Sequence, residues 1–331
     1  MKNEYCKILT FYAISPIHAG SGSMISAIDL PIQRERHTNW PHIQASSVKG
    51  ALRDHYRNFS PQNDEKLINF IFGSDYENDN LPGNPEESIP GCIAVTDAKL
   101  LAFPVRSNEA PFLWITCPLA IQRLYSDLEF TGSPVHFQVQ VDSLKLKKEE
   151  GMWVRNKINS IDKNILLEDT VVKIEREIYY KELWDMILPA NINRLLLVED
   201  EIYTYLVETA TEIQTQIKID SNSGTTKTGS LRYQELLPAD SFLYTLVYFK
   251  DKYVPDYPKK NEYEDEDEEK EEKKEKEDEK ALEELYNQVK NLQMEAIIKS
   301  VETTINGFIQ IGGDYTLGRG LCAIEWKTLS K

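Results

Sequence analysis

The chain has 331 residues, of which 41% are hydrophobic and 28% charged, and it carries a formal net charge of −16 at pH 7. This length fits one large domain with insertions or two smaller domains. No apolar run approaches the ~20 residues of a membrane-spanning helix and the N-terminus lacks a signal-peptide pattern, so we expect a soluble, cytoplasmic protein.

The first predicted strand covers residues 6–14, a run of β-branched and aromatic side chains that ends ahead of Gly20 and Gly22. A polar loop of about thirty residues follows and contains Asp29. A connection of this length without regular structure is uncommon in a compact domain and is often functional.

A helix is predicted next, with Ser46 or Ser47 as a good N-cap. Apolar residues at helical spacing form the stripe that we expect to be buried: Val48, Ala51, Leu52, Tyr56 and Phe59. Lys49, Arg53 and Arg57 step by four along another face. This basic ridge begins at the positive end of the helix dipole, where an anion is stabilised.

Strands and helices alternate through the middle of the chain. Strands are predicted at 92–101, 112–117, 165–174 and 195–198, and helices at 119–128 and 179–188. Side-chain character alternates with period two over residues 211–220. A turn at 221–224 connects this segment to a second one at 230–236, and together they predict a hairpin. Because Thr, Gln and Lys occupy both of its faces, we expect this hairpin to project from the body.

A charged run follows a strand predicted at 241–249. Residues 259–284 hold 15 acidic and 7 basic residues, a net of −8 that is half of the total. The excess of acidic residues over basic ones argues against a nucleic-acid partner. Because half of this excess lies in one segment, a basic groove can still form elsewhere in the chain. Residues 262–280 are nearly all charged, which predicts a disordered or solvated helical excursion.

The last predicted elements are a helix at 281–305, a strand at 308–311, a glycine-rich loop at 312–320 and a closing strand at 321–326. Strands interleaved with helices predict an α+β fold of the ferredoxin-like or RNA-recognition-motif kind. Four cysteines lie far apart without C-x-x-C spacing, which predicts reduced, mostly buried thiols: Cys6, Cys92, Cys117 and Cys322.

The glycine-rich loop is a candidate phosphate-binding loop. Gly312, Gly313, Gly318 and Gly320 allow main-chain amides to approach phosphates, and Arg319 adds a cation with bidentate reach. The loop lacks a Gly-Lys-Ser/Thr ending and no helix follows it, so we do not expect an ATPase. A flexible hairpin turn is the alternative interpretation.

Two side chains of the first loop are candidates for chemistry. Asp29 precedes Pro31, so a stiff backbone presents its carboxylate at a defined angle, and Mg²⁺ commonly combines one or two carboxylates with phosphate oxygens. The alternative for Asp29 is an Asx turn. His18 could shuttle protons, donate to a phosphate or be structural.

No Ser, His and Asp arrangement supports a covalent hydrolase. Aromatic residues that could stack on bases are Tyr233, Tyr244, Tyr248 and Tyr315.

Five segments match a known family in its own order: 16–22, 29–38, 46–53, 234–238 and 312–320. Through them the sequence resembles the repeated backbone subunit of the Cmr complex, the type III-B CRISPR RNA-silencing effector, within the RAMP superfamily. The resemblance implies an RNA-recognition-motif palm with helical insertions, built from residues 1–201 and 239–331. It also implies a protruding β-hairpin thumb at 202–238 and a charged insertion at about 255–280.

The resemblance implies an activity and partners as well. Copies of the subunit would form a filament on guide CRISPR RNA with other Cmr subunits, and each thumb would displace one base pair of the guide–target duplex. Asp29 would support cleavage of target RNA with Mg²⁺ or Mn²⁺, and His18 and Glu235 are further catalytic candidates. The residues implied to bind RNA are Ser46, Ser47, Lys49, Arg53, Arg57, Gly312, Gly313, Tyr315, Gly318, Arg319 and Gly320.

Two alternatives remain open at the level of sequence. The chain could be a non-catalytic guide-RNA scaffold of the same architecture in which Asp29 is idle. It could also be a monomeric guide-processing ribonuclease that uses His18 as its base.

Overall fold

The computed structural model describes residues 5–23, 27–61, 64–73, 90–131, 146–155, 163–177, 181–250 and 294–327. The chain divides into two compact units. The first comprises Met1–Tyr5, Leu52–Ala94 and Tyr248–Ile305, and the second comprises Cys6–Ala51, Val95–Val247 and Asn306–Lys331. The candidate site described below lies in the second unit.

The second unit is built on a large, mostly antiparallel sheet. Strand β1 (Cys6–Ala13) lies between β14 (Leu321–Lys327) and β12 (Phe242–Phe249), and β13 (Gly307–Gln310) pairs with the far side of β14. The β1–β14 register runs from Ile8 opposite Lys327 to Ala13 opposite Cys322. The two ends of the chain therefore form adjacent strands, which confirms the predicted strands at 6–14 and 321–326.

The sheet continues from β12 through strands of the middle of the chain. In spatial order these are β4 (Ala98–Val105), β5 (Leu113–Thr116), β9 (Leu195–Val198), β6 (Glu150–Arg155), β8 (Thr170–Glu177) and β7 (Asn164–Leu167), while the short β2 (His42–Ile43) pairs with β4. All four residues of β9 are buried, as expected for a strand covered on both faces. The three helices among these strands are α3 (Pro118–Phe130), α4 (Lys181–Ile187) and α5 (Asp200–Thr209).

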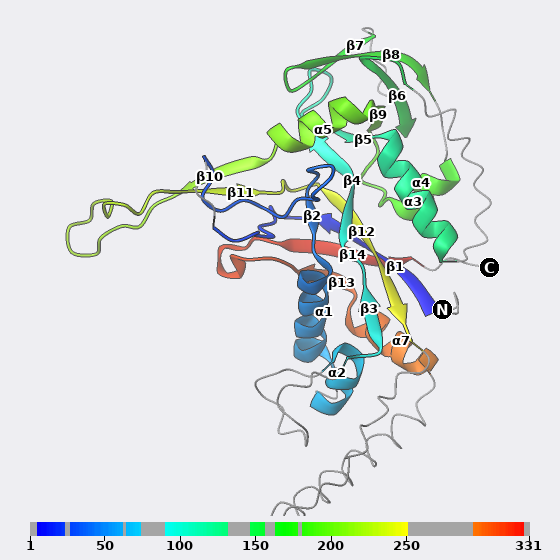
Figure 1. Ribbon diagram of the computed structural model, residues 1–331, viewed down its shortest axis with the longest axis vertical. Coiled ribbons are helices and arrows are strands. Elements are labelled where there is room, and N and C mark those ends of the chain that lie inside the picture. The colour runs from blue at the N-terminus through cyan, green and yellow to red at the C-terminus, as the bar shows by residue number, and fades with distance from the viewer. Residues whose placement is uncertain are drawn as a thin grey trace, which may run out of the picture. The chain divides into compact units, whose positions relative to one another are not determined.

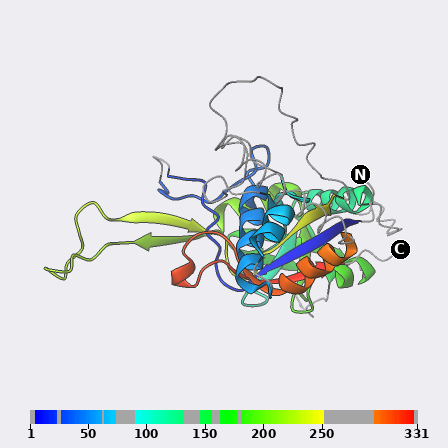
Figure 2. The ribbon, with the colours of Figure 1, turned by 90° about the horizontal axis from the view of Figure 1, so that it is seen from below.

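A separate hairpin of β10 (Glu212–Gln216) and β11 (Arg232–Leu236) projects away from the sheet (Figures 1 and 2). Its projection confirms the prediction. The expectation of two polar faces is wrong, because exposed apolar side chains occupy the hairpin: Ile213, Ile217, Ile219, Leu231 and Tyr233. Thr215 pairs with Tyr233 and Ile213 with Glu235, so in β10 and β11 the exposed Ile213 and Tyr233 share one face, while the glutamines lie on the other.

Among the described residues of the first unit, three helical segments surround a small core. They are the second part of α1 (Ala45–Phe59), α2 (Glu65–Phe72) and α7 (Met294–Thr304). Tyr56 is buried, its hydroxyl lies 2.8 Å from Ser300 Oγ, and its ring centroid lies 5.7 Å from that of Phe72. Strand β3 (Ile93–Val95) belongs to this unit except for its last residue.

Several predicted boundaries differ from the structure. Helix α1 begins at Ala45, ahead of the predicted caps, where the Ala45 N–H donates to Asp97 Oδ1 at 2.7 Å. Phe59 is 55% exposed instead of buried. The strand predicted at 165–174 is the hairpin β7–β8, which turns at Glu168 with φ of +52°. Of the range predicted as a thumb, 202–209 lies in α5.

The strand predicted at 92–101 is divided between β3 and β4, and some other predictions lie outside the described residues. The helix predicted at 281–305 is described only for its part from Met294 onward, and the charged segment 255–280 lies outside the described residues. All four cysteines are free and buried, as predicted. Helix α2 and strand β6 were not predicted. Within the part of the chain that the structure describes, no helix has the length and apolar character needed to cross a membrane.

Candidate functional site

Gln33 links three parts of the first fifty residues: the glycine turn, the first loop and the start of α1. Its N–H donates to Ala19 O at 2.8 Å, and its side-chain Nε2 donates to Gly20 O at 3.2 Å. Its Oε1 accepts the N–H of Gln44, the residue before α1, at 2.7 Å. Because Gln33 is buried, these bonds fix the glycine turn, the first loop and the start of α1 relative to one another.

Asp29 is attached to strand β11 by main-chain and side-chain bonds. Its Oδ2 accepts the N–H of Tyr233 at 2.8 Å, and the N–H groups of Asp29 and Leu30 both donate to Tyr233 O at 3.1 Å. The Glu235 N–H donates to Leu30 O at 3.0 Å. No described residue donates to Asp29 Oδ1. The half-buried carboxylate is thus held through one oxygen and presents the other.

Glu235 holds the first loop on β11 through its side chain. Its Oε1 accepts from Arg34 Nη2 at 2.6 Å and from Thr211 Oγ1 at 2.8 Å, and its Oε2 accepts the Ile32 N–H at 3.1 Å. The side chain is only 4% exposed. Both oxygens of this predicted catalytic candidate are therefore used by the protein, which favours a positioning role over contact with a substrate.

His18 lies where the glycine turn meets the glycine-rich loop. Its Nδ1 is 2.9 Å from Glu235 O, and because a carbonyl only accepts, Nδ1 carries the hydrogen in this contact. The Gly313 N–H donates to His18 O at 2.9 Å. A Cβ on Gly20 would lie 2.8 Å from Nε2, and one on Gly312 would lie 2.6 Å from His18 O. Glycine is required at 312, where the close atom is main chain and φ is +87°, whereas a side chain at 20 would need the His18 ring to move.

The glycine-rich loop 312–320 is closed at its base and exposed at its tip. The Ile311 N–H donates to Gly320 O at 2.8 Å, and a short 3₁₀ turn, Tyr315–Leu317, forms the tip. Tyr315 is 73% exposed, so it is available to stack on a base. The predicted stacking of Tyr244 is wrong, because this residue is buried in β12.

The two terminal nitrogens of the Arg319 guanidinium donate to protein acceptors. Its Nη1 donates to Asp314 Oδ2 at 2.7 Å and to Gln234 Oε1, and its Nη2 donates to Gln214 Oε1. Gln234 Nε2 donates to Asp314 Oδ2 at 2.7 Å. We call these four residues the Arg319 cluster; it links the glycine-rich loop to both strands of the hairpin.

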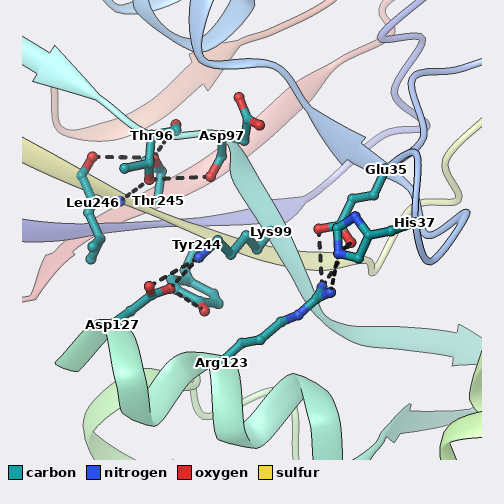
Figure 3. A network of polar contacts seen from close by, with 10 residues as sticks. All are labelled: Glu35, His37, Thr96, Asp97, Lys99, Arg123, Asp127, Tyr244, Thr245 and Leu246. Carbon is teal, nitrogen blue, oxygen red and sulfur yellow. Dashed lines mark hydrogen bonds and ion pairs between the residues drawn. The ribbon is translucent and has the colours of Figure 1, made fainter. Parts of the chain in front are cut away.

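A second polar network holds the end of the first loop (Figure 3). Arg123 of α3 donates to Glu35 Oε2 at 2.8 Å, and its Nη2 lies 2.8 Å from His37 Nε2. Burial raises the pKa of Glu35, but hydrogen bonds from Thr38 and Arg123 outweigh this and leave the pKa below its ordinary value. The loop carrying Asp29 is thus fixed to α3 as well as to β11.

One helical turn further along α3, Asp127 fixes the helix to the sheet (Figure 3). It accepts from Lys99 Nζ of β4 at 2.7 Å and from the Tyr244 hydroxyl of β12 at 2.8 Å. Burial, together with the neighbouring Asp127 charge, raises the pKa of Tyr244 well above its ordinary value. The tyrosine therefore stays a hydrogen-bond donor.

The predicted basic ridge of α1 is divided between the two units. In the second unit Ser46 is exposed, Ser47 and Lys49 are half-buried, and all three lie in the first turns of the helix. In the first unit Arg53 Nη2 donates to Asn69 Oδ1 at 2.6 Å, and Arg57 forms an ion pair with Glu65 at 2.9 Å. The two arginines already have protein partners.

Among the described residues, no group of three or more His, Cys, Asp and Glu side chains is arranged to hold a metal ion. A metal at this site would have to combine the single carboxylate of Asp29 with oxygens from elsewhere. Sequence reasoning selected Asp29, His18 and the glycine-rich loop. The sequence did not predict the roles of Gln33, Arg34 and Gln234. The one feature that could have pointed to these residues is that they lie inside the matched segments.

Comparison with known proteins gives a consistent result. The family model described as the RAMP superfamily matches residues 10–323. The CRISPR system Cmr endoribonuclease Cmr4 of Pyrococcus furiosus is 32% identical over 336 residues, covering 98% of this chain and 96% of the relative. The CRISPR system CMR subunit Cmr4 of Saccharolobus solfataricus is 26% identical over 278 residues, covering 72% of this chain and 85% of the relative.

The fold is likewise shared with a solved structure. The crystal structure of oligomeric Cmr4 from Pyrococcus furiosus matches with a TM-score of 0.64 at 24% identity and covers 99% of each chain.

Proposed function

This chain belongs to the RAMP superfamily and, within it, to the family of Cmr4 subunits, and from that membership we propose that it is a guide-RNA-binding filament subunit of a type III-B CRISPR complex that cleaves complementary target RNA. The observation that carries the proposal is the carboxylate of Asp29, held on β11 through Oδ2 with Oδ1 left available. Its partners are guide CRISPR RNA, target RNA, further copies of itself and other Cmr subunits.

The proposed architecture assigns a role to each part of the second unit. Its sheet is the palm of the RNA-recognition-motif kind, and the hairpin β10–β11 is the thumb. The exposed apolar face of the hairpin supports this assignment, because side chains such as Ile213 and Tyr233 can contact bases that are separated from their stack. In this proposal the thumb begins at Glu212, after α5.

The guide backbone is proposed to lie against the start of α1 and the glycine-rich loop. Ser46 and Ser47 sit in the first turn of the helix, where main-chain N–H groups and the helix dipole favour an anion, and Lys49 adds positive charge. Gly312, Gly313, Gly318 and Gly320, with the exposed ring of Tyr315, would contribute main-chain donors and a stacking surface. Arg53 and Arg57 contribute less, because each already has a protein partner.

Cleavage of RNA at a kink requires few chemical groups from the protein. In the target RNA a 2′-oxygen attacks the neighbouring phosphorus and loses its proton to a base, while the bond to the 5′-oxygen breaks and that oxygen gains a proton. A kinked strand places the attacking oxygen in line, so the protein has mainly to orient the strand and stabilise charge on the phosphate.

Asp29 fits a role as the protein ligand of a divalent metal. A carboxylate oxygen without a protein donor is the hard ligand that Mg²⁺ and Mn²⁺ prefer, and Mg²⁺ often takes one or two carboxylates together with substrate phosphates. A bound metal would neutralise negative charge that develops on the phosphate oxygens. The bonds from Tyr233, Leu30 and Glu235 hold Asp29 in place for that task.

Replacing Asp29 with Asn tests the proposal in the assembled complex. Asn keeps an oxygen that can accept the Tyr233 N–H, so we expect complex assembly and guide binding to match the wild type. Cleavage of target RNA should fall by at least about a hundredfold, because removal of one electrostatic stabiliser costs about that much. Gel analysis of labelled target would measure it, and retained cleavage would reject Asp29 as the residue that supports cleavage.

A chelator separates this proposal from cleavage that uses His18 as a base. Addition of EDTA should abolish cleavage by the wild-type complex, and Mg²⁺ or Mn²⁺ should restore it. A ribonuclease that depends on the Nε2 of His18 would remain active without metal. Persistence of cleavage in EDTA, combined with its loss in His18→Ala, would establish that alternative.

A further inference from the structure

Three consecutive residues of β11 hold two separate segments, the first loop and the glycine-rich loop. The main chain of Tyr233 holds Asp29, and the side chain of Glu235 holds the first loop at Ile32 and Arg34. The side chain of Gln234, which points to the other face of the strand, contacts the glycine-rich loop through Asp314 and Arg319. The position of β11 therefore determines the position of the Asp29 carboxylate.

Arg319 is the residue that attaches β11 and β10 to the glycine-rich loop. Its Nη1 donates to Gln234 of β11 and its Nη2 donates to Gln214 of β10, while the carboxylate of Asp314 balances its charge. Only the planar guanidinium has donors spaced to serve both strands at once.

The surroundings of Arg319 are poorly suited to binding phosphate. Its side chain is 11% exposed, and its charge is already paired with Asp314 at 2.7 Å. A phosphate that approached the two terminal nitrogens would have to compete with Asp314, Gln234 and Gln214, which already accept from them. The Gln234 side chain is itself buried and accepts from Arg319 and Gln216.

We propose that Arg319 is a positioning residue for target cleavage: the Arg319 cluster fixes β11 against the glycine-rich loop and thereby holds Asp29 in its working position. Arg319 is not a ligand of the RNA backbone. The inference rests on the proposed function, since it concerns how the cleaving carboxylate is oriented. It predicts that changes in the cluster slow the cleavage step without weakening guide binding.

Two substitutions of Arg319 distinguish positioning from phosphate binding. Arg319→Lys keeps the charge but loses the fork, and Arg319→Met removes the charge while retaining a long side chain. Under the proposal both variants cleave saturating target roughly 10- to 100-fold more slowly, because small displacements of a catalytic group cost about that much. The half-saturating target concentration and the guide affinity stay at wild-type values.

The salt dependence of guide binding is the decisive second readout. Loss of one phosphate contact lowers the slope of log affinity against log salt concentration by about 1. We expect both variants to keep the wild-type slope. If Arg319→Lys cleaves normally while Arg319→Met loses guide affinity and has a lower slope, Arg319 binds phosphate and the proposal is wrong. Normal cleavage by both variants would also overturn it.

The matched control is Arg106→Lys. The guanidinium of Arg106 likewise donates two hydrogen bonds, both to Glu168. Its side chain is 84% exposed and makes no contact with β11 or the glycine-rich loop. The cleavage rate of Arg106→Lys should equal that of the wild type.

Thermal unfolding verifies that each variant is folded. If Arg319→Met does not fold, Asp314→Asn serves in its place, because it removes the charge that orients Arg319 while preserving shape, and the same slow cleavage with unchanged salt slope is expected.

Failure of this inference can be told apart from failure of the proposed function. If Asp29→Asn abolishes cleavage but the Arg319 variants cleave normally, only the positioning role is rejected. If Asp29→Asn itself cleaves normally, the catalytic assignment of Asp29 is rejected, and with it the reason to position that residue.

Discussion

At the scale of single residues, two adjacent and oppositely charged positions hold the first loop. Arg34 pairs with Glu235 at 2.6 Å, and Glu35 pairs with Arg123 at 2.8 Å. All four side chains are largely shielded from solvent, so removing one partner would leave the other charge without compensation. The two pairs therefore matter more to this loop than surface ion pairs usually do.

Replacing Glu35 with Gln should destabilise the protein by about 1–3 kcal/mol at pH 7, since charged hydrogen bonds to Arg123 are lost. The pKa of Glu35 is lowered in the folded chain, so its stabilisation is complete above the unfolded pKa of about 4.3 and is lost as pH falls through the folded pKa. Urea unfolding at pH 7 and at about pH 3 would measure this. The gap between wild type and variant should narrow in acid; a gap that stays constant with pH contradicts the explanation.

Glu168→Gln provides the control for this measurement. Glu168 also accepts a guanidinium, but its partner Arg106 is 84% exposed. We expect a loss below about 1 kcal/mol, as for other solvent-screened pairs.

At the scale of elements, the glycine-rich loop depends on its close approach to the main chain of His18. Gly312 has φ of +87°, and a Cβ there would lie 2.6 Å from His18 O. Gly318 has a similar φ of +71°, but a Cβ there would meet no atom within 4 Å. The two positions share one backbone conformation and differ in the space available.

Gly312→Ala should therefore be more destabilising than Gly318→Ala. The left-handed conformation costs an L-residue of order 1 kcal/mol at either position, and at 312 the clash with the main chain adds to it. Thermal unfolding of the two variants would compare them directly. Equal losses of stability would show that the contact with His18 does not constrain the loop.

The elements themselves were largely predictable, because their signals are local. Strands 6–14 and 195–198 and the helix beginning near Ser46 each carry a continuous hydrophobic pattern. The strand predicted at 165–174 failed because its turn is formed by Glu168 and Asp169, with no glycine to mark it. Helix α5 was assigned to the thumb because its sequence adjoins the hairpin without a break in composition.

The site was predictable in its members and not in its contacts. Asp29 and the glycine-rich loop stand out by residue type and by the family motif. The partners of Arg319 do not, because Gln234 and Gln214 lie 85 and 105 positions away along the chain. An arginine beside glycines predicts a phosphate ligand, and only the packing of β10 and β11 reveals that its terminal nitrogens also donate to these strands.

At the scale of the whole molecule, charge is distributed unevenly along the chain. Residues 259–284 carry half of the net charge of −16, so the remaining sequence is less repulsive to RNA than the total implies. Long-range repulsion acts mainly on the rate of association and is screened within about 10 Å at 0.1 M salt.

Substituting Gln for eight acidic residues within 259–284 should raise the association rate with guide RNA at low salt. The substitution removes half of the net negative charge without changing chain length, and we expect a several-fold faster rate. Stopped-flow binding at about 0.05 M and 1 M salt would measure it, and the advantage should disappear at the higher concentration. An equal advantage at both concentrations would mean that the segment acts through something other than its charge.

Strand β11 has a consequence for how such chains can diverge. Side chains alternate along a strand, so inserting or deleting one residue within Arg232–Leu236 would exchange its two faces and displace the first loop and the glycine-rich loop together. Indels between the paired residues Gln216 and Arg232 leave that register untouched. Homologous chains should therefore vary freely in the length of the hairpin end while keeping a fixed spacing from Tyr233 to Pro238.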